Sequence, residues 1–161
     1  MNYGILIWGH QSDRIHKLQK RAIRLITGSK YNTHSERLFK RLNLLKITDI
    51  FNLSQLKFFH KYINTQLPDY FQKISFIQRN ELHQHNTRDN HRLHVYVRKH
   101  IFADNCIRQS IPKLLNETAL CIKQKLYTHS LHGFSSYTKN YVINAYSNEC
   151  FVRHCHVCNQ P

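Results

Sequence analysis

The chain has 161 residues, with 24 Lys and Arg against 9 Asp and Glu, which gives a formal net charge of +15 and a pI near 9.9. No apolar run approaches the ~18 residues that a membrane-spanning helix needs, so we expect no membrane partner. The number of cysteines, five, is odd, and three of them lie in the last twelve residues. This pattern argues against a secreted disulfide framework and for an intracellular location, nucleus or cytoplasm. The basic excess, with 12% aromatic residues, favours a polyanionic partner such as RNA or DNA; a solvated basic surface is the alternative.

The low content of Gly and Pro favours long helices over a turn-rich β fold. Residues 3–9 are expected to form a buried extended segment. A helix is predicted next over 14–27, with Asp13 as its N-cap and Gly28 as its C-cap. Two stripes repeat along this helix at helical spacing, about 100° per residue. The apolar stripe comprises Ile15, Leu18, Ala22, Leu25 and Ile26, and the basic stripe comprises Arg14, Lys17, Arg21 and Arg24.

Two further helices are predicted before residue 70. Thr33 and Glu36 form a capping-box pattern, which predicts a short helix after Thr33. Thr48 is expected to cap a central helix over about 49–65, which Pro68 stops. The inward residues are expected to be Leu38, Phe39 and Leu42 in the first helix and Ile50, Leu53, Leu56, Phe59 and Ile63 in the second.

The second half of the chain begins with a polar linker over 78–92. Alternation with period two over 93–98 predicts a strand, and a partner strand over 106–111, ended by Pro112, would complete a β-hairpin. Helices are expected over about 118–131, with Thr118 as cap, and over 136–146. The predicted fold class is therefore mostly α, a small helical bundle followed by a short β-hairpin and further helices. The predicted segments are 1–77 (basic helical region), 78–92 (linker), 93–147 (hairpin plus helices) and 148–161 (Cys/His-rich tail).

The basic stripe on the helix over 14–27 is the main candidate for contact with nucleic acid, because Lys and Arg at helical spacing can follow phosphates; an ordinary solvated amphipathic helix is the alternative. A second basic and aromatic cluster lies near the predicted strand, where Tyr96 could stack on an unpaired base. The pattern fits equally well a polar face of the hairpin with no nucleic-acid contact. The candidate nucleic-acid-binding residues are Arg14, Lys17, Lys20, Arg21, Arg24, Arg37, Lys40, Arg41, Arg88, Arg92, Tyr96 and Arg98.

The tail carries a possible zinc site. Cys155-x-x-Cys158 has the spacing with which two thiolates bind one Zn²⁺ from a tight turn. Cys150 is a candidate third ligand and His154 or His156 a fourth. Half of a zinc knuckle and plain unpaired thiols are the alternatives, since no second CxxC or HxxxH pair is present.

Polymerase chemistry by this chain alone is not expected. It needs paired carboxylates that hold two Mg²⁺ about 3.5–4 Å apart. The nine acidic residues are scattered singly, and there is no Asp-Asp pair, Gly-rich phosphate loop or nucleophile elbow. We therefore predict no catalytic residues and no enzyme activity of the chain by itself.

Several short motifs, in order along the chain, resemble one known family. Tyr3-Gly4-Ile5-Leu6-Ile7-Trp8-Gly9, followed by the basic helix at 18–26, is similar to a stretch just after the polymerase core in reverse transcriptases of non-LTR (LINE-type, jockey-like) retrotransposons. Glu36-Arg37-Leu38-Phe39 is similar to a Glu-Pro-Leu-Phe segment of that family, with Arg37 in place of proline. The remaining similar motifs are Leu67-Pro68 with Phe71, Asn86-Thr87-Arg88, and Ile111-Pro112-Lys113, the last without the family's Gly and Trp.

The resemblance implies that the chain corresponds to the thumb and post-polymerase region of an RNA-directed DNA polymerase, as a fragment without the active site. A thumb of this family grips the template–primer duplex, mainly by its sugar–phosphate backbone, so little sequence specificity is implied. The implied partners are RNA and/or DNA and the upstream polymerase region of the parent enzyme.

Two rival functions stay open. One is a stand-alone, domesticated nucleic-acid-binding protein, which predicts an affinity that falls steeply with salt. The other is a non-catalytic interaction or scaffold fragment, which predicts no binding of RNA or DNA at physiological salt.

Overall fold

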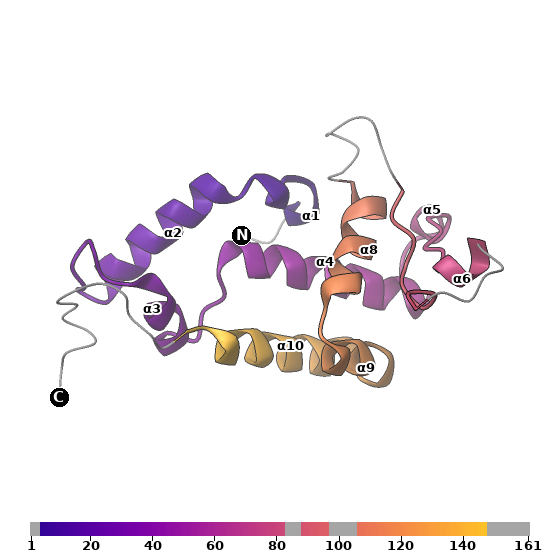
Figure 1. Cartoon of the computed structure of the whole chain (residues 1–161). Helices are drawn as coiled ribbons and strands as arrows, with labels where there is room; N and C mark the ends of the chain where they lie inside the picture. Colours follow the sequence, from indigo (N-terminus) through magenta and orange to yellow (C-terminus); the bar gives the residue numbers. More distant parts are fainter. Residues whose placement is uncertain (1–3, 83–87, 97–105, 148–161) are drawn as a thin grey trace. The chain divides into compact units, whose positions relative to one another are not determined.

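The structure is a computed structural model that describes residues 4–82, 88–96 and 106–147 (Figure 1). Most of these residues are helical, so the mostly-α prediction is confirmed. The chain divides into two compact units: unit 1 contains the described residues of Met1–Phe51 and Ser136–Pro161, and unit 2 is Asn52–Ser135. The helices are α1 (Ile5–Trp8), the 3₁₀ turn η1 (Gly9–Gln11), α2 (Asp13–Ile26), α3 (Ser35–Arg41), α4 (Ile47–Ile63), α5 (Asp69–Gln72), α6 (Arg79–Leu82), α8 (Ile107–Glu117), α9 (Leu120–Thr128) and α10 (Leu131–Ala145).

Helical turns replace the extended segment that was expected over 3–9. Residues from Gly4 onward form α1 and η1, and Ile5 is buried. Gly9 lies directly on the ring of Phe51, where an added Cβ would come within 2.3 Å of a ring carbon. Any side chain at this position would clash, so the close approach of the two elements requires glycine. An extended conformation would also need a partner strand, and none lies beside residues 4–9 in the described structure.

The helix α2 begins and ends within one residue of the predicted bounds, but its capping residues differ from those predicted. Asp13 is the first helical residue and not the N-cap; Ser12 holds the cap position, and its side chain makes no capping bond. The carboxylate of Asp13 in the first turn still lies at the favourable end of the helix dipole. At the other end Thr27 holds the C-cap position, and Gly28, the predicted cap, follows it: the φ of Gly28 is 62°, and the N–H of Ser29 donates to the carbonyl of Arg24 at 2.9 Å. This is the Schellman arrangement that a left-handed glycine permits.

The caps predicted for the next two helices are wrong. The helix α3 begins at Ser35, after His34, and Glu36 forms an ion pair with Lys46 instead of folding back on Thr33. Thr48 lies inside α4, which begins at Ile47. For α3, the ion pair with Lys46 replaces the local bond that the sequence pattern offers.

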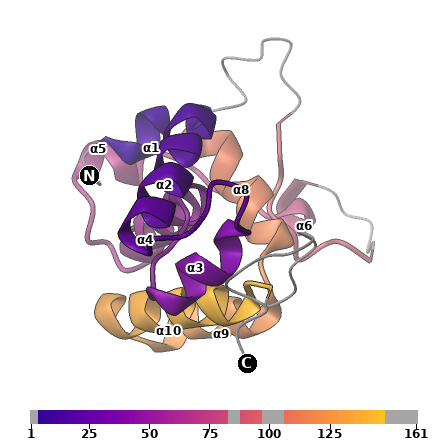
Figure 2. The same cartoon turned by 90° about the vertical axis from the view of Figure 1, so that its left-hand side faces the viewer.

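The buried faces of these helices are largely as predicted. Leu38 and Phe39 of α3 are completely buried, and Leu53, Leu56 and Phe59 of α4 are buried. Within unit 1, the ring of Phe39 meets the rings of His16 and Tyr146 edge-on, at centroid distances of 6.3 and 6.5 Å. Figure 2 shows α3 beside α2 in this unit. The core of unit 1 therefore lies around Phe39.

Tyr146 joins the returning end of the chain to the rest of unit 1. Its hydroxyl donates to the carboxylate of Asp49 and accepts the N–H of Lys46 at 3.0 Å. The Lys46 ammonium lies 4.4 Å from the centre of the Tyr146 ring, and the Lys40 ammonium donates to the carbonyls of Asn144 and Tyr146 at 3.2 and 3.1 Å. Burial, followed by the bond to Asp49, raises the pKa of the Tyr146 hydroxyl.

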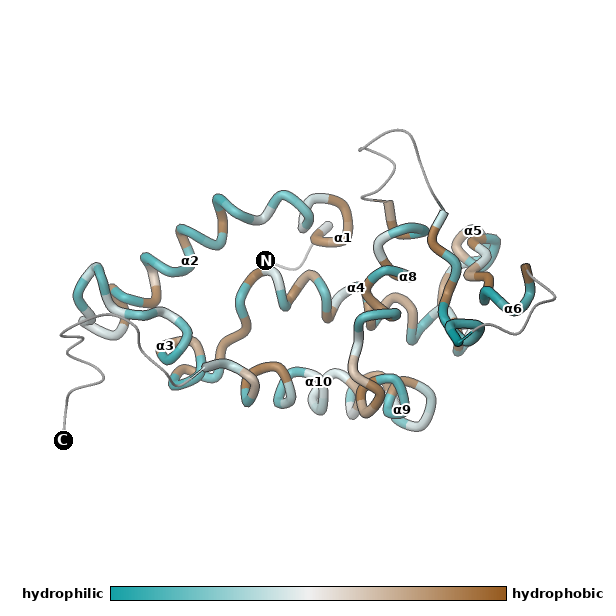
Figure 3. Tube along the Cα trace, in the orientation of Figure 1, coloured by the Kyte–Doolittle hydropathy of each residue, from teal (hydrophilic) through white to brown (hydrophobic). Residues whose placement is uncertain are grey.

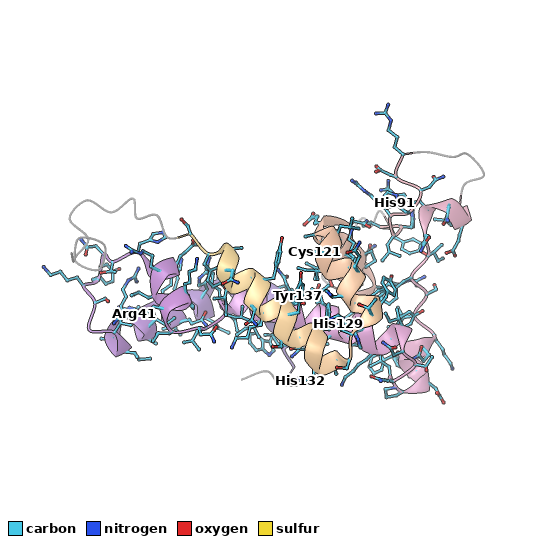
Figure 4. All side chains as sticks on the ribbon, turned by 90° about the horizontal axis from the view of Figure 1, so that it is seen from below. Arg41, His91, Cys121, His129, His132 and Tyr137 are labelled. Atoms are coloured by element: carbon cyan, nitrogen blue, oxygen red, sulfur yellow. The ribbon has the colours of Figure 1, made fainter. Side chains whose placement is uncertain are left out.

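Unit 2 packs the later turns of α4 with α8, α9 and the start of α10. Its buried residues include Phe59, Ile111 and Leu126. His60 is buried, lies parallel to Phe134 at a centroid distance of 5.5 Å, and bonds through Nε2 to the carbonyl of His129 at 2.8 Å. His129 is among the residues labelled in Figure 4.

The predicted β-hairpin is wrong over the described residues. The only pairing there is one antiparallel bridge between Gln78 and Leu93, and residues 107–111 belong to α8, with Pro112 inside the helix. The backbone of Leu93 is bonded instead by the side chain of Asn116, which accepts its N–H at 3.0 Å and donates to its carbonyl at 2.9 Å. A side-chain amide therefore replaces a partner strand.

The last two helices begin at other positions than predicted. Thr118 ends α8 and does not cap the next helix, since α9 begins at Leu120 after Ala119. Gly133 lies inside α10, which begins at Leu131.

Replacing Tyr146 with Phe is expected to destabilise the fold by about 1–3 kcal/mol. The change keeps the ring contacts but leaves the Asp49 carboxylate and the Lys46 N–H without the hydroxyl that bonds both. Chemical unfolding measures the change. The matched control is Tyr141→Phe, whose side chain is exposed on α10; equal midpoints for the two variants would show that the hydroxyl of Tyr146 contributes no stability.

Candidate nucleic-acid interface

One side of α2 attaches the helix to unit 1 through a polar residue. The side-chain amide of Gln19 donates to the carbonyl of Leu45 and accepts the N–H of Ile47, both at 2.9 Å. Ile23, one turn further on, is the buried apolar residue of the helix, at 2% exposure. The exposed residues of α2, away from this attached side, remain accessible for other contacts.

Three cations of the predicted basic stripe lie on the free surface of α2. Arg14, Lys17 and Arg21 are exposed, and none of them pairs with a carboxylate in the described part of the chain. Their spacing of three and four residues places them on one face of the helix. They form what we call the α2 basic face.

Lys20 and Arg24 occupy a different environment. Both are half-buried. The Nε of Arg24 donates to the carbonyl of Thr33 at 2.9 Å, and its guanidinium carbon lies 5.9 Å from the centre of the Tyr31 ring. Arg24 therefore supports the turn between α2 and α3, and it differs in this from the three residues of the basic face.

The cations predicted on α3 separate in a similar way. Arg41 is exposed at the end of the helix, where Figure 4 labels it. Arg37 is half-buried, and Lys40 is bonded to the two carbonyls near Tyr146. Of these three residues, Arg41 is the one most accessible to a large polyanion.

The second predicted cluster belongs to unit 2 and is partly neutralised. Arg92 pairs with Asp89 at 3.1 Å, and Arg79 approaches the same carboxylate at 3.8 Å. Tyr96 is half-buried, and the guanidinium carbon of Arg108 lies 4.9 Å from the centre of its ring. Arg88 is exposed, whereas Arg98 lies outside the described residues.

The apolar stripe of α2 also faces outward. Leu18, Leu25 and Ile26 are 60%, 82% and 71% exposed, so the hydrophobic pattern of this helix is not used to bury it. Figure 3 shows hydrophobic and hydrophilic positions alternating along α2. Exposed apolar residues gathered on one helix are typical of a surface that contacts another molecule.

A polar pocket lies beneath α2 in unit 1, and no pattern in the sequence predicted it. Its volume is ≈260 Å³. Its cations come from α2 and from Lys46, and its two imidazoles come from elements that the turn after α2 brings together. The lining residues are His16, Lys20, Arg24, Asn32, Thr33, His34, Ser35, Glu36 and Lys46.

Electrostatics within this pocket disfavour added positive charge. Burial lowers the pKa of the His16 imidazole from its ordinary value, and the charges of Lys20 and Lys46 lower it further, against weaker opposing effects of Asp49 and Asp13. The Lys46 ammonium in turn holds the pKa of Glu36 below its usual value.

The described structure gives no information about the predicted zinc site. Within residues 4–82, 88–96 and 106–147 no group of three or more His, Cys, Asp or Glu could hold a metal ion. Cys150, His154, Cys155, His156 and Cys158 all lie outside those ranges, so zinc binding stays a prediction. None of the described helices combines the length and apolar character needed to cross a membrane.

Comparison with known proteins gave no match to a protein-family model, to a curated protein or to a solved structure.

Replacing His16 with Gln is expected to reduce the loss of stability on mild acidification. Because the folded state holds the His16 pKa below 6.5, the unfolded chain takes up the proton first as the pH falls, and stability declines from about pH 6.5 downward. The variant lacks this titration. Unfolding midpoints at pH 7.5 and pH 5.5 measure the effect. The control is His132→Gln, which changes an exposed histidine. Equal pH dependence of stability in the His16 variant and the wild type would contradict the prediction.

Proposed function

We propose that this chain binds nucleic acid through the α2 basic face and carries no catalytic activity of its own. In this proposal it corresponds to the thumb and post-polymerase region of a non-LTR retrotransposon reverse transcriptase, and it holds nucleic acid next to an active site carried by the upstream polymerase region. The observation that carries the proposal is the exposure of Arg14, Lys17 and Arg21 on one helix of a chain with net charge +15.

The mode of binding follows from the chemistry of this face. Exposed Lys and Arg side chains neutralise phosphates and release condensed counterions, which makes the affinity depend on salt and not on base sequence. The α2 basic face has neighbouring apolar residues but no described aromatic side chain within it. Contact with the sugar–phosphate backbone of a duplex therefore fits this surface better than stacking on unpaired bases.

The family assignment rests on the order of the short motifs along the chain, from the Trp8-Gly9 pair to Ile111-Pro112-Lys113. The helical composition of the described residues is compatible with a thumb-like region.

A protein-interaction fragment is the second candidate. The outward apolar residues Leu18, Leu25 and Ile26 favour it, because phosphates offer them no partner. The two functions are compatible on one helix, since the apolar and basic stripes of α2 consist of different, neighbouring residues.

The double variant Lys17→Ala/Arg21→Ala is expected to weaken binding to a labelled primer–template duplex and to flatten its salt dependence. The slope of log K against log salt should become shallower by about 0.9 for each phosphate contact that is lost. The matched control, Lys61→Ala/Lys73→Ala, removes the same charge from exposed positions of unit 2. Fluorescence anisotropy across a salt series measures both.

Three outcomes separate the alternatives. Equal slopes for the two double variants would mean that the α2 basic face is not the site. Absence of binding at low salt, from a chain shown to be folded, would contradict the nucleic-acid proposal and favour the interaction fragment. A loss of binding in the presence of a zinc chelator would indicate that the C-terminal Cys/His cluster participates.

A further inference from the structure

We propose that the polar pocket beneath α2 binds a phosphate group. This inference goes beyond the proposed function, because a phosphate group can belong to nucleic acid or to a free phosphate compound. All of the lining residues belong to unit 1 and come from α2, the turn that follows it, α3 and Lys46.

The side chains around the pocket carry a net positive charge that carboxylates neutralise only in part. Lys20, Arg24 and Lys46 line it against a single carboxylate, Glu36, which is already paired with Lys46. Lys20 pairs with no carboxylate among the described residues. Arg24 uses its Nε–H on the carbonyl of Thr33, and a guanidinium carries four further N–H donors. Two cations therefore remain available to an anion.

Two buried ring nitrogens in the lining residues lack partners. The Nε2 of His16 and the Nδ1 of His34 are buried, and neither has a hydrogen-bond partner within the described part of the chain. Buried polar atoms without partners are uncommon in folded proteins, and each calls for an explanation such as a bound ligand. An imidazole nitrogen that carries a proton can donate to a phosphate oxygen.

The size and lining of the pocket fit a small polar anion. Its ≈260 Å³ is several times the ≈30 Å³ that one water molecule occupies in the liquid. The lining residues are all polar or charged, so an apolar ligand would leave their donors unsatisfied. A phosphate group offers charge and several acceptor oxygens in one compact unit, which matches cationic donors converging from different elements.

The test compares Lys20, which lines the pocket, with Lys61, an exposed lysine of unit 2. Inorganic phosphate is titrated into the full chain by calorimetry, with the imidazole resonances of His16 followed by NMR. Lys20→Gln is expected to weaken phosphate binding about tenfold, since it removes one charge-assisted bond. Lys61→Gln removes the same charge from an exposed position of unit 2, outside both the pocket and the α2 basic face, and should leave the affinity within about twofold of wild type.

Saturable binding that shifts His16 and depends on Lys20 supports the pocket. Equal weakening by both variants would mean that phosphate only screens the basic surface, and absence of saturable binding would overturn the proposal outright. As a control, the unfolding midpoints of both variants are compared with that of the wild type. Midpoints close to the wild-type value show that a loss of phosphate binding is not caused by unfolding.

The source of the phosphate is identified with two oligonucleotides of one sequence, one with a 5′-phosphate and one with a 5′-hydroxyl. Tighter binding of the 5′-phosphate form that Lys20→Gln abolishes assigns a terminal phosphate. If both oligonucleotides bind equally and inorganic phosphate displaces them, the pocket binds a backbone phosphate. If both bind equally and inorganic phosphate binds the chain without displacing them, the pocket binds a free phosphate compound. The double variant Lys17→Ala/Arg21→Ala leaves all pocket residues in place. The salt-dependence experiment therefore tests the α2 basic face, and the phosphate titration of Lys20→Gln separately tests the pocket.

Discussion

Unit 1 is built from two ends of the chain, and the side chain of Tyr146 makes the contacts that hold them together. Its ring packs edge-on against Phe39, and its hydroxyl bonds both the Asp49 carboxylate and the Lys46 backbone. Lys46, fixed in this way, pairs with Glu36 at the start of α3 and lines the polar pocket. The position of α3, and with it the shape of the pocket beneath α2, therefore depends on an aromatic residue that is distant in sequence from all of them.

The way in which α2 is attached decides what the helix can do. Gln19 binds the segment around Leu45 and Ile47 with two hydrogen bonds, and Ile23 supplies the buried apolar contact. A strongly amphipathic helix normally buries its apolar stripe, which lowers the free energy of the fold. In this chain a polar residue serves as the anchor, so the apolar stripe and the α2 basic face both remain at the surface. One short helix thus presents two chemically different surfaces to other molecules.

The sequence predicted those features that depend on local pattern. Helical periodicity placed α2 and α4 correctly, and the left-handed Gly28 followed from the need for a residue without Cβ after the last turn. The predicted capping box at Thr33 and the hairpin failed for a common reason, since the distant partners Lys46 and Asn116 satisfy the groups that a local motif would have satisfied. The exposure of the α2 basic face followed from its pattern, whereas the pocket did not, because it depends on how the turn after α2 folds back.

The division of the chain also bears on how it folds during synthesis. Unit 2 is one continuous stretch, so its contacts can form as soon as that stretch has left the ribosome. Unit 1 begins before unit 2 but is completed by Tyr146, which follows its partner Asp49 by 97 positions. Closing so long a loop is slow, and until it closes the nascent helices α2 and α3 expose Leu38 and Phe39 as well as the apolar stripe. The segment of unit 1 that precedes unit 2 is therefore made before unit 2 but protected after it, and a chaperone that shields nascent apolar helices would act on this segment.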